Sequence, residues 1–193
     1  ENPVWSHWKL DETQGITAFD SSGNNNEAAL SGFTFSGGSA PGLIANALSF
    51  DGINDYTVHT LTAQDWSNYT ISLWVKASVL GQKNYSAVLN TSNLTTTGFQ
   101  IDVTGDTPGN YRYISGNGSI DIGTVTTDWV HLAVSFDGQV TRVYYNGSYV
   151  DSAKQNDSDF NQIALGVNRS GGRFFQGIID DVQVYQRTLN NGE

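Results

Sequence analysis

Short apolar stretches of strand length alternate along the chain with clusters of Gly, Asn, Asp and Ser, roughly one cluster every ten residues. Large apolar residues occupy every second position from Val130 to Phe136, which predicts a strand with one buried face. A second run, residues 141–145, ends at Asn146-Gly147, the residue pair most typical of a two-residue hairpin turn. We therefore predict that residues 148–150 run back antiparallel to residues 141–145.

The same kind of pattern predicts further strands on both sides of this hairpin. They cover residues 47–50, 70–76, 86–89, 99–103, 111–115 and 177–185. No segment has the apolar periodicity of a long helix, and no repeat of fixed period occurs. These observations predict an all-β sandwich or barrel in which residues 1–193 form a single domain.

The composition narrows the range of partners. The length of 193 residues suits one large β domain with its own core. With 19 acidic and 9 basic residues the net charge is −10, which opposes binding to nucleic acid and to anionic membrane surfaces. Cys and Met are absent, so disulfides, thiolate metal sites and cysteine nucleophiles are excluded. Divalent cations and neutral, hydroxyl-rich ligands such as sugars are compatible with this surface.

Targeting signals are not evident in the sequence. No apolar run reaches the length of a membrane span, so we expect no membrane insertion, and the first residues do not form a signal peptide. The chain starts at Glu1 without an initiator Met. We expect a mature or excised piece of a larger protein that is secreted or displayed on the cell surface, tethered there to other domains.

Four segments occur in a characteristic order and spacing. They are residues 8–12 with 20–24, residues 47–52 with 54–56, residues 70–76, and residues 129–147 leading to 179–182. Together they resemble the laminin-G-like jelly rolls of the concanavalin A-like lectin and glucanase superfamily, over nearly the whole chain. The glycine that usually follows the Asn-rich turn is replaced within residues 25–28, so the local backbone is expected to differ there.

The resemblance carries expectations about fold and function. It implies two antiparallel sheets packed as a jelly-roll sandwich, with the first and last strands as neighbours. It also implies service as a carbohydrate-binding or adhesion module beside other domains, and often a calcium ion that holds the two ends of the chain together.

Asp180 is the most informative single residue in the sequence, because its neighbours predict where its side chain lies. By strict alternation it points the same way as Ile178, Val182 and Val184, so we expect its carboxylate to be buried. A buried charge without a partner is strongly unfavourable, so Asp180 requires a cation, an Arg or several backbone donors. Because the resemblance places the chain ends together, Glu12 and the turn at Asp20 are expected nearby.

The Asn-rich loop at residues 20–26 offers side-chain and backbone oxygens, which are the ligands that calcium prefers. With the resemblance, this predicts a structural Ca²⁺ ion. The predicted ligands are Glu12, Asp20, Asn24, Asn26 and Asp180. The alternative is a loop whose Asp and Asn side chains cap its own backbone. Residues 51–56 are also rich in oxygen, and a turn between strands is the favoured interpretation there.

Aromatic and planar polar side chains in loops are the second set of candidates. Sugar rings stack on aromatic side chains while planar polar groups fix the hydroxyls. The predicted ligand-binding residues are Tyr85, Tyr111, Tyr113, Arg173 and Phe174. The alternative for each is a place in the sandwich core. Trp74 and Trp129 lie in strand contexts that match the family pattern, and we assign both to structure.

Catalysis has little support in the sequence. A glycoside hydrolase on this fold would place two Glu and an Asp along one strand, but glutamate occurs only at positions 1, 12, 27 and 193. Asp102 with Asp106 and Asp180 with Asp181 are the remaining pairs, and neighbours in a regular strand face opposite sides. No common enzyme motif occurs.

We therefore predict a non-catalytic carbohydrate-binding module with a structural calcium ion. The alternative is an adhesion or spacer module of a cell-surface protein. A glycoside hydrolase or polysaccharide lyase with an unusual carboxylate set ranks third.

Overall fold

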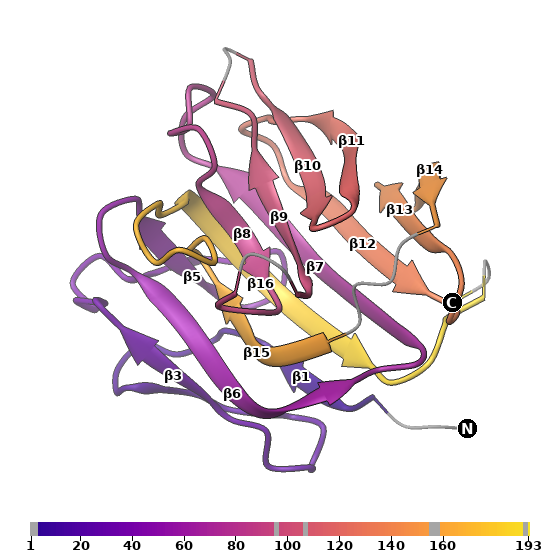
Figure 1. Cartoon of the computed structure of the whole chain (residues 1–193). Coiled ribbons are helices and arrows are strands. Elements are labelled where there is room, and N and C mark those ends of the chain that lie inside the picture. The colour runs from indigo at the N-terminus through magenta and orange to yellow at the C-terminus, as the bar shows by residue number, and fades with distance from the viewer. Residues whose placement is uncertain (1–3, 95–96, 106–107, 155–158, 191–192) are drawn as a thin grey trace.

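Two antiparallel sheets pack face to face in the computed structural model, which describes residues 4–94, 97–105, 108–154, 159–190 and 193 (Figure 1). Sheet A contains, in spatial order, β14 (Ser148–Ala153), β13 (Thr141–Tyr145), β12 (Val130–Phe136), β7 (Tyr69–Ala77), β16 (Gln176–Tyr185), β5 (Asn46–Asp51) and β4 (Ser39–Pro41), and β1 (Ser6–Trp8) also pairs with β16. Sheet B contains β11 (Gly118–Thr124), β10 (Asn110–Ser115), β9 (Phe99–Val103), β8 (Ala87–Asn90), β15 (Asp159–Leu165), β6 (Tyr56–Asp65), β3 (Ala28–Ser31) and β2 (Thr17–Ala18).

This arrangement confirms the predicted all-β sandwich and its jelly-roll resemblance. The first strand, β1, pairs with the last, β16, through the register Ser6 to Val184. All nine strands predicted from the sequence are present, and β9, β12 and β13 have the expected bounds. Among the described residues no helix has the length and apolarity needed to cross a membrane.

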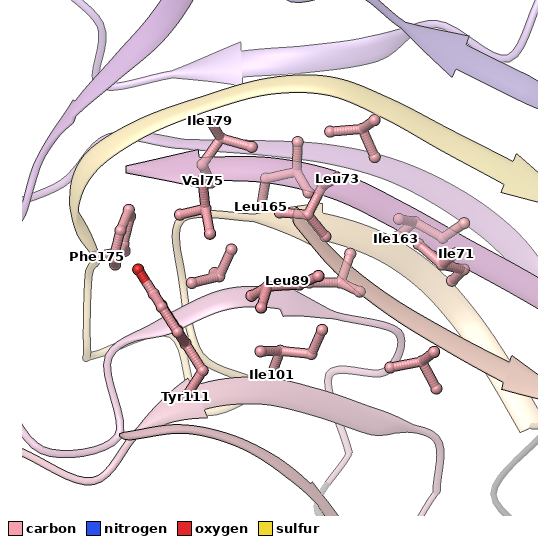
Figure 2. Close-up of a cluster of buried hydrophobic side chains, with 14 of the residues drawn as sticks. Ile71, Leu73, Val75, Leu89, Ile101, Tyr111, Ile163, Leu165, Phe175 and Ile179 are labelled. Atoms are coloured by element: carbon pink, nitrogen blue, oxygen red, sulfur yellow. The ribbon is translucent and has the colours of Figure 1, made fainter. Parts of the chain in front are cut away.

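The core fills the space between the two sheets (Figure 2). Ile71, Leu73 and Val75 point into it from β7, and Leu89 and Ile101 meet them from sheet B, all five with no exposed surface. Alternate residues of β7 therefore face away from the core, on the outer face of sheet A. That outer face carries the groove described below.

Strands β6 and β15 were missed by the sequence prediction. β15 changes register against β6 between Phe160 and Gln162, so the core residues Phe160 and Ile163 are three positions apart. A bulge of this kind removes the two-residue period on which strand prediction depends.

A second bulge, in β16, corrects the prediction for Asp180. Asp181 has a φ of 49°, and the register with β7 shifts between Asp180 and Gln183. Ile179 and Val182 consequently both face the core, three positions apart. Asp180 pairs with Trp74 on the outer face of sheet A, so the expectation that it shares a face with Val182 is wrong.

Asp180 is nevertheless only 2% exposed, because the loop between β4 and β5 covers it. Its Oδ2 accepts hydrogen bonds from the backbone N–H groups of Leu43 (2.7 Å) and Ile44 (3.5 Å). Burial raises the pKa of Asp180, and these backbone hydrogen bonds only partly offset that rise. Gly42 is required in this loop, since a Cβ there would lie 2.7 Å from the same carboxylate oxygen. The partner that the buried charge requires is thus a set of backbone donors.

Candidate functional site

A groove with a volume of about 490 Å³ lies on the outer face of sheet A, and we call it the sheet A groove. Its floor is made by small side chains of the two central strands, Thr70 and Ser72 from β7 and Ala133 and Ser135 from β12. Ala133 lies directly opposite Ser72, and Ser135 lies opposite Thr70. The flanking strands β13 and β16 carry larger side chains, so the sheet is hollow along its middle.

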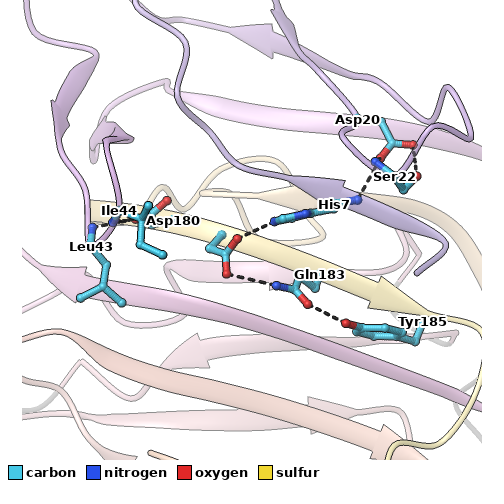
Figure 3. A network of polar contacts seen from close by, with 9 residues as sticks. His7, Asp20, Ser22, Leu43, Ile44, Asp180, Gln183 and Tyr185 are labelled. Carbon is cyan, nitrogen blue, oxygen red and sulfur yellow. Dashed lines mark hydrogen bonds and ion pairs between the residues drawn. The ribbon is translucent and has the colours of Figure 1, made fainter. Parts of the chain in front are cut away.

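The wall on β16 is a hydrogen-bonded row of polar side chains (Figure 3). Tyr185 donates its hydroxyl to Gln183 Oε1 (2.6 Å), and Gln183 Nε2 donates to Asp181 Oδ2 (3.1 Å). The other oxygen of Asp181 lies 2.5 Å from Nε2 of His7, on the neighbouring strand β1. These contacts fix the orientation of an acid, an amide and a phenol along one side of the groove.

Aromatic rings form the far end of the groove, and Tyr144 on β13 lines its side. Trp74 and His131 are paired residues on β7 and β12, with ring centroids 5.1 Å apart. Burial lowers the pKa of His131, and the opposing effect of Asp181 is smaller, so the imidazole is neutral at pH 7. A second hollow of about 500 Å³ shares both rings and continues past them to Trp129 and Asn146.

Residues 187–190, which follow β16, form the near end of the groove. Leu189 donates its N–H to Thr70 Oγ1 (3.0 Å), and the same hydroxyl donates to the carbonyl of Arg187 (3.0 Å). Thr188 Oγ1 donates to the carbonyl of Phe136 at the end of β12 (2.8 Å). This segment thereby crosses the ends of both central strands, and Leu189 lines the groove together with Asn190.

The groove has the chemistry of a carbohydrate site. Rings such as Trp74 stack on the C–H faces of sugars, and oriented amide, carboxylate and hydroxyl groups bind sugar hydroxyls. Its two acidic residues are both held by other groups: Asp181 by His7 and Gln183, and Glu193 by Arg187. Both acids of the groove are thus fixed in orientation by their partners.

The aromatic prediction was partly wrong. Tyr111 and Tyr113 have no exposed surface and belong to the core, because β10 directs every second residue inward. Tyr85 is 46% exposed and lies under the guanidinium of Arg112, whose carbon is 5.2 Å from the ring centroid. Tyr85 is thus accessible to a ligand, although it does not line the sheet A groove.

Phe174 and Arg173 remain at the surface of the molecule. Phe174 lines a smaller pocket of about 200 Å³ on the outer face of sheet B, beside Tyr56 and Asn168. Arg173 is exposed. Both residues are therefore accessible, and both are separate from the sheet A groove.

Trp74 and Trp129, assigned to structure from the sequence, are instead part of the groove and its continuation. The strand pattern contained the signal for Trp74. Ile71, Leu73 and Val75 share one parity and form the buried face, which leaves Trp74 on the opposite face.

The five predicted calcium ligands do not all come together: Asp20, Asn24 and Asn26 lie in one loop, whereas Asp180 is held by the β4–β5 loop. The Asp20 carboxylate accepts hydrogen bonds from the N–H groups of His7 (2.9 Å), Ser22 (2.9 Å) and Asn26 (3.0 Å) and from the Ser22 hydroxyl (2.7 Å). Burial raises the pKa of Asp20, but these hydrogen bonds outweigh it and hold the pKa below its ordinary value. Four donors occupy the lone pairs that a cation would need.

The other predicted ligands also have protein partners. Asn24 and Asn26 both donate their side-chain amides to the carbonyl of Trp5, at 3.0 Å and 2.7 Å. Glu12 accepts the N–H of Phe19 (2.9 Å), and burial raises its pKa. Within the described part of the chain, no three His, Asp or Glu side chains gather as metal ligands. These residues do not fit a calcium ion, and the self-capped loop describes the segment at Asp20 better.

Chelation should therefore leave the stability of the protein unchanged. We expect the Tm measured in about 5 mM EDTA to agree within about 1 °C with the Tm measured in excess CaCl₂. An ion that bound only to the folded state would raise the Tm in CaCl₂. Differential scanning calorimetry measures both values. A clearly higher Tm in calcium would contradict the hydrogen-bonding described for Asp20.

Of the two carboxylate pairs considered for catalysis, the structure describes Asp180 with Asp181 in full, and these two do not share one space. Asp180 is covered by the β4–β5 loop, whereas Asp181 faces the groove. Asp102 is fully buried and bonded to Arg112, at 3.0 Å from both Nε and Nη2. Asp106 lies outside the described residues.

Comparison with solved structures gives matches over almost the whole chain. Domain 4 of AbnA, a GH43 extracellular arabinanase from Geobacillus stearothermophilus, in complex with arabinotriose, has a TM-score of 0.73 and 23% identity over 100% of this chain and 96% of its own. The receptor binding domain of botulinum neurotoxin C/D mosaic serotype has a TM-score of 0.74 and 17% identity. The binding domain of Paraclostridial Mosquitocidal Protein 1 has a TM-score of 0.72 and 20% identity.

The coverage differs between these neighbours. The match to the neurotoxin domain includes 98% of this chain but only 49% of that domain. The match to the mosquitocidal protein domain includes 99% of this chain and 50% of that domain. It thus spans about half the length of both toxin domains. At these identities the likeness shows a shared fold.

Comparison with families and curated sequences completes the assignment. No curated protein matches the sequence. The family model described as the concanavalin A-like lectin/glucanases superfamily matches residues 50–193, which include both central strands of the groove. The chain belongs to the concanavalin A-like lectin/glucanase superfamily.

Proposed function

We propose that this protein is a non-catalytic carbohydrate-binding module that holds an oligosaccharide in the sheet A groove. The observation that carries the proposal is the groove itself. A floor of small side chains lies between an aromatic end at Trp74 and a hydrogen-bonded polar row from Asp181 to Tyr185. This combination provides stacking and oriented hydroxyl binding in one hollow of oligosaccharide size.

The charges of the groove favour a neutral ligand. Asp181 and Glu193 are its charged residues, and no Lys or Arg lines it in the described part of the chain. The whole chain carries a net charge of −10. Sugars that bear carboxylates or sulfates would meet repulsion both at the groove and at long range.

The structural neighbours support this class of ligand and an extracellular setting. Domain 4 of AbnA is an arabinanase domain in complex with a neutral trisaccharide, and the enzyme is extracellular. Neutral pentose and hexose oligosaccharides are therefore the first probes for this protein. We further propose that the module works outside the cell and is attached to other domains.

Removal of the stacking platform tests the location of the site. We expect Trp74→Ala to weaken binding of neutral oligosaccharides by about 5- to 30-fold, because a ring contact of this kind contributes about 1–2 kcal/mol. Isothermal titration against arabino-, xylo-, manno-, galacto- and gluco-oligosaccharides measures the affinity.

Tyr85→Ala is the matched control, since Tyr85 is an exposed aromatic residue away from the groove. Its affinity should equal that of the unchanged protein. A loss of affinity in Tyr85→Ala with none in Trp74→Ala would move the site to the loops predicted from the sequence. Failure of the unchanged protein to bind any of these sugars would refute the proposed function and favour the adhesion or spacer alternative.

A further inference from the structure

We infer that the sheet A groove is closed at one end and therefore binds the terminal sugar of a chain rather than an internal stretch. This inference rests on the proposed function and specifies its ligand: the free end of a neutral polysaccharide or oligosaccharide.

The closed end is the one formed by residues 187–190, which follow β16. Leu189 and Thr188 attach this segment to β7 and β12 through hydrogen bonds to Thr70 Oγ1 (3.0 Å) and to the carbonyl of Phe136 (2.8 Å). Arg187 pairs with Glu193 (2.6 Å between Nη2 and Oε1), which also lines the groove. The segment is thus bonded to the ends of both floor strands and blocks the path of a sugar chain along them.

The opposite end has no such closure in the described part of the chain. There the groove continues past Trp74 and His131 into the second hollow, which reaches Trp129 and the exposed turn at Asn146. A sugar chain with its end against Leu189 would leave the groove over the Trp74 ring. The geometry therefore gives the chain one direction of entry.

Ser135 supplies an independent sign of a ligand at the closed end. It lies on the floor beside Thr70, is only 2% exposed, and its hydroxyl has no hydrogen-bond partner among the described residues. The Thr70 hydroxyl beside it donates to Arg187 and accepts from Leu189, and no hydrogen bond joins it to Ser135. A buried hydroxyl without a partner is unfavourable, and a hydroxyl of a terminal sugar would satisfy it.

The test counts binding sites per mass of polysaccharide. Linear arabinan, xylan, mannan, galactan and a soluble glucan are titrated before and after partial cleavage by the matching endo-hydrolase, which creates new chain ends. For the polymer that binds, we expect the number of sites to rise in proportion to the number of ends. An unchanged or reduced number of sites would overturn the inference and leave the proposed function intact. Absence of binding to all five polymers would overturn both.

Ser135→Ala tests the closed end itself. The ligand is the trisaccharide made of the sugar that binds best. We expect Ser135→Ala to weaken its binding by roughly 3- to 10-fold, the effect of one hydrogen bond, and to leave the Tm equal to or higher than that of the unchanged protein. Ser86→Ala is the matched control, because Ser86 is also a buried serine whose hydroxyl lacks a partner among the described residues, away from the groove. Its affinity should not change. Equal affinities for both variants would show that no sugar reaches Ser135, and would overturn the inference.

Discussion

Ala133→Phe is expected to abolish oligosaccharide binding, with a rise in Kd of more than about 100-fold, and to leave the fold intact. Ala133 is the centre of the groove floor, opposite Ser72 on β7 and Tyr144 on β13. Directly paired side chains on one face of a sheet are separated by roughly 5 Å, so a phenyl ring here occupies the space of the ligand. The ring extends away from the core, which avoids the strain of an overpacked interior.

The matched control for this substitution is Ala133→Ser. Serine keeps the small size of the floor, as in Ser72 and Ser135, and we expect its Kd to stay within about twofold of the original. Titration with the neutral oligosaccharide that binds best, together with the Tm of each variant, separates blocking from unfolding. Full binding by a folded Ala133→Phe protein would place the ligand elsewhere on the molecule.

Strand parity made much of the site predictable. The alternation in β12 was read from the sequence, and it assigns His131, Ala133 and Ser135 to the face away from the core. The same reading of β7 leaves Trp74 outside, although the family pattern led us to assign it to structure. In β10 the parity would also have shown that Tyr111 and Tyr113 are buried, since Arg112 lies between them on the other face. For Trp74, strand parity predicted the exposed face more accurately than the family pattern did.

Other features depend on contacts between distant segments and leave no local pattern. The bulge at Asp181 reverses the parity of the last strand, which is why Asp180 was placed on the wrong face. The loop above Asp180 and the segment at Leu189 cover polar residues that a single sheet would expose. Calcium was predicted from the family resemblance together with the oxygens near Asp20, whereas the structure satisfies that carboxylate with backbone donors and the Ser22 hydroxyl.

The two outer faces of the sandwich differ in what they contribute. On sheet A the buried hydroxyl of Ser135 has no partner among the described residues, in a groove left open for a ligand. On sheet B the buried Asp102 is fully bonded: Arg112 donates to both of its oxygens and Gln100 Nε2 donates to one (2.7 Å). We infer that binding depends on the first face and stability on the second.

Asp102→Ala should accordingly destabilise the protein by about 3 kcal/mol, a fall in Tm of roughly 6–12 °C, without changing its affinity for sugar. The carboxylate has no exposed surface, and Arg112 is 18% exposed, so the substitution leaves a largely buried cation and the Gln100 amide without their acceptor. Arg142→Ala is the control, because it breaks a pair with Asp137 whose side chains are 35% and 32% exposed, and such pairs contribute less than about 1 kcal/mol. Chemical denaturation measures both free energies of unfolding. Equal losses for the two variants would contradict the structural role of Asp102, and a weaker sugar affinity in folded Asp102→Ala would contradict the separation of the two faces.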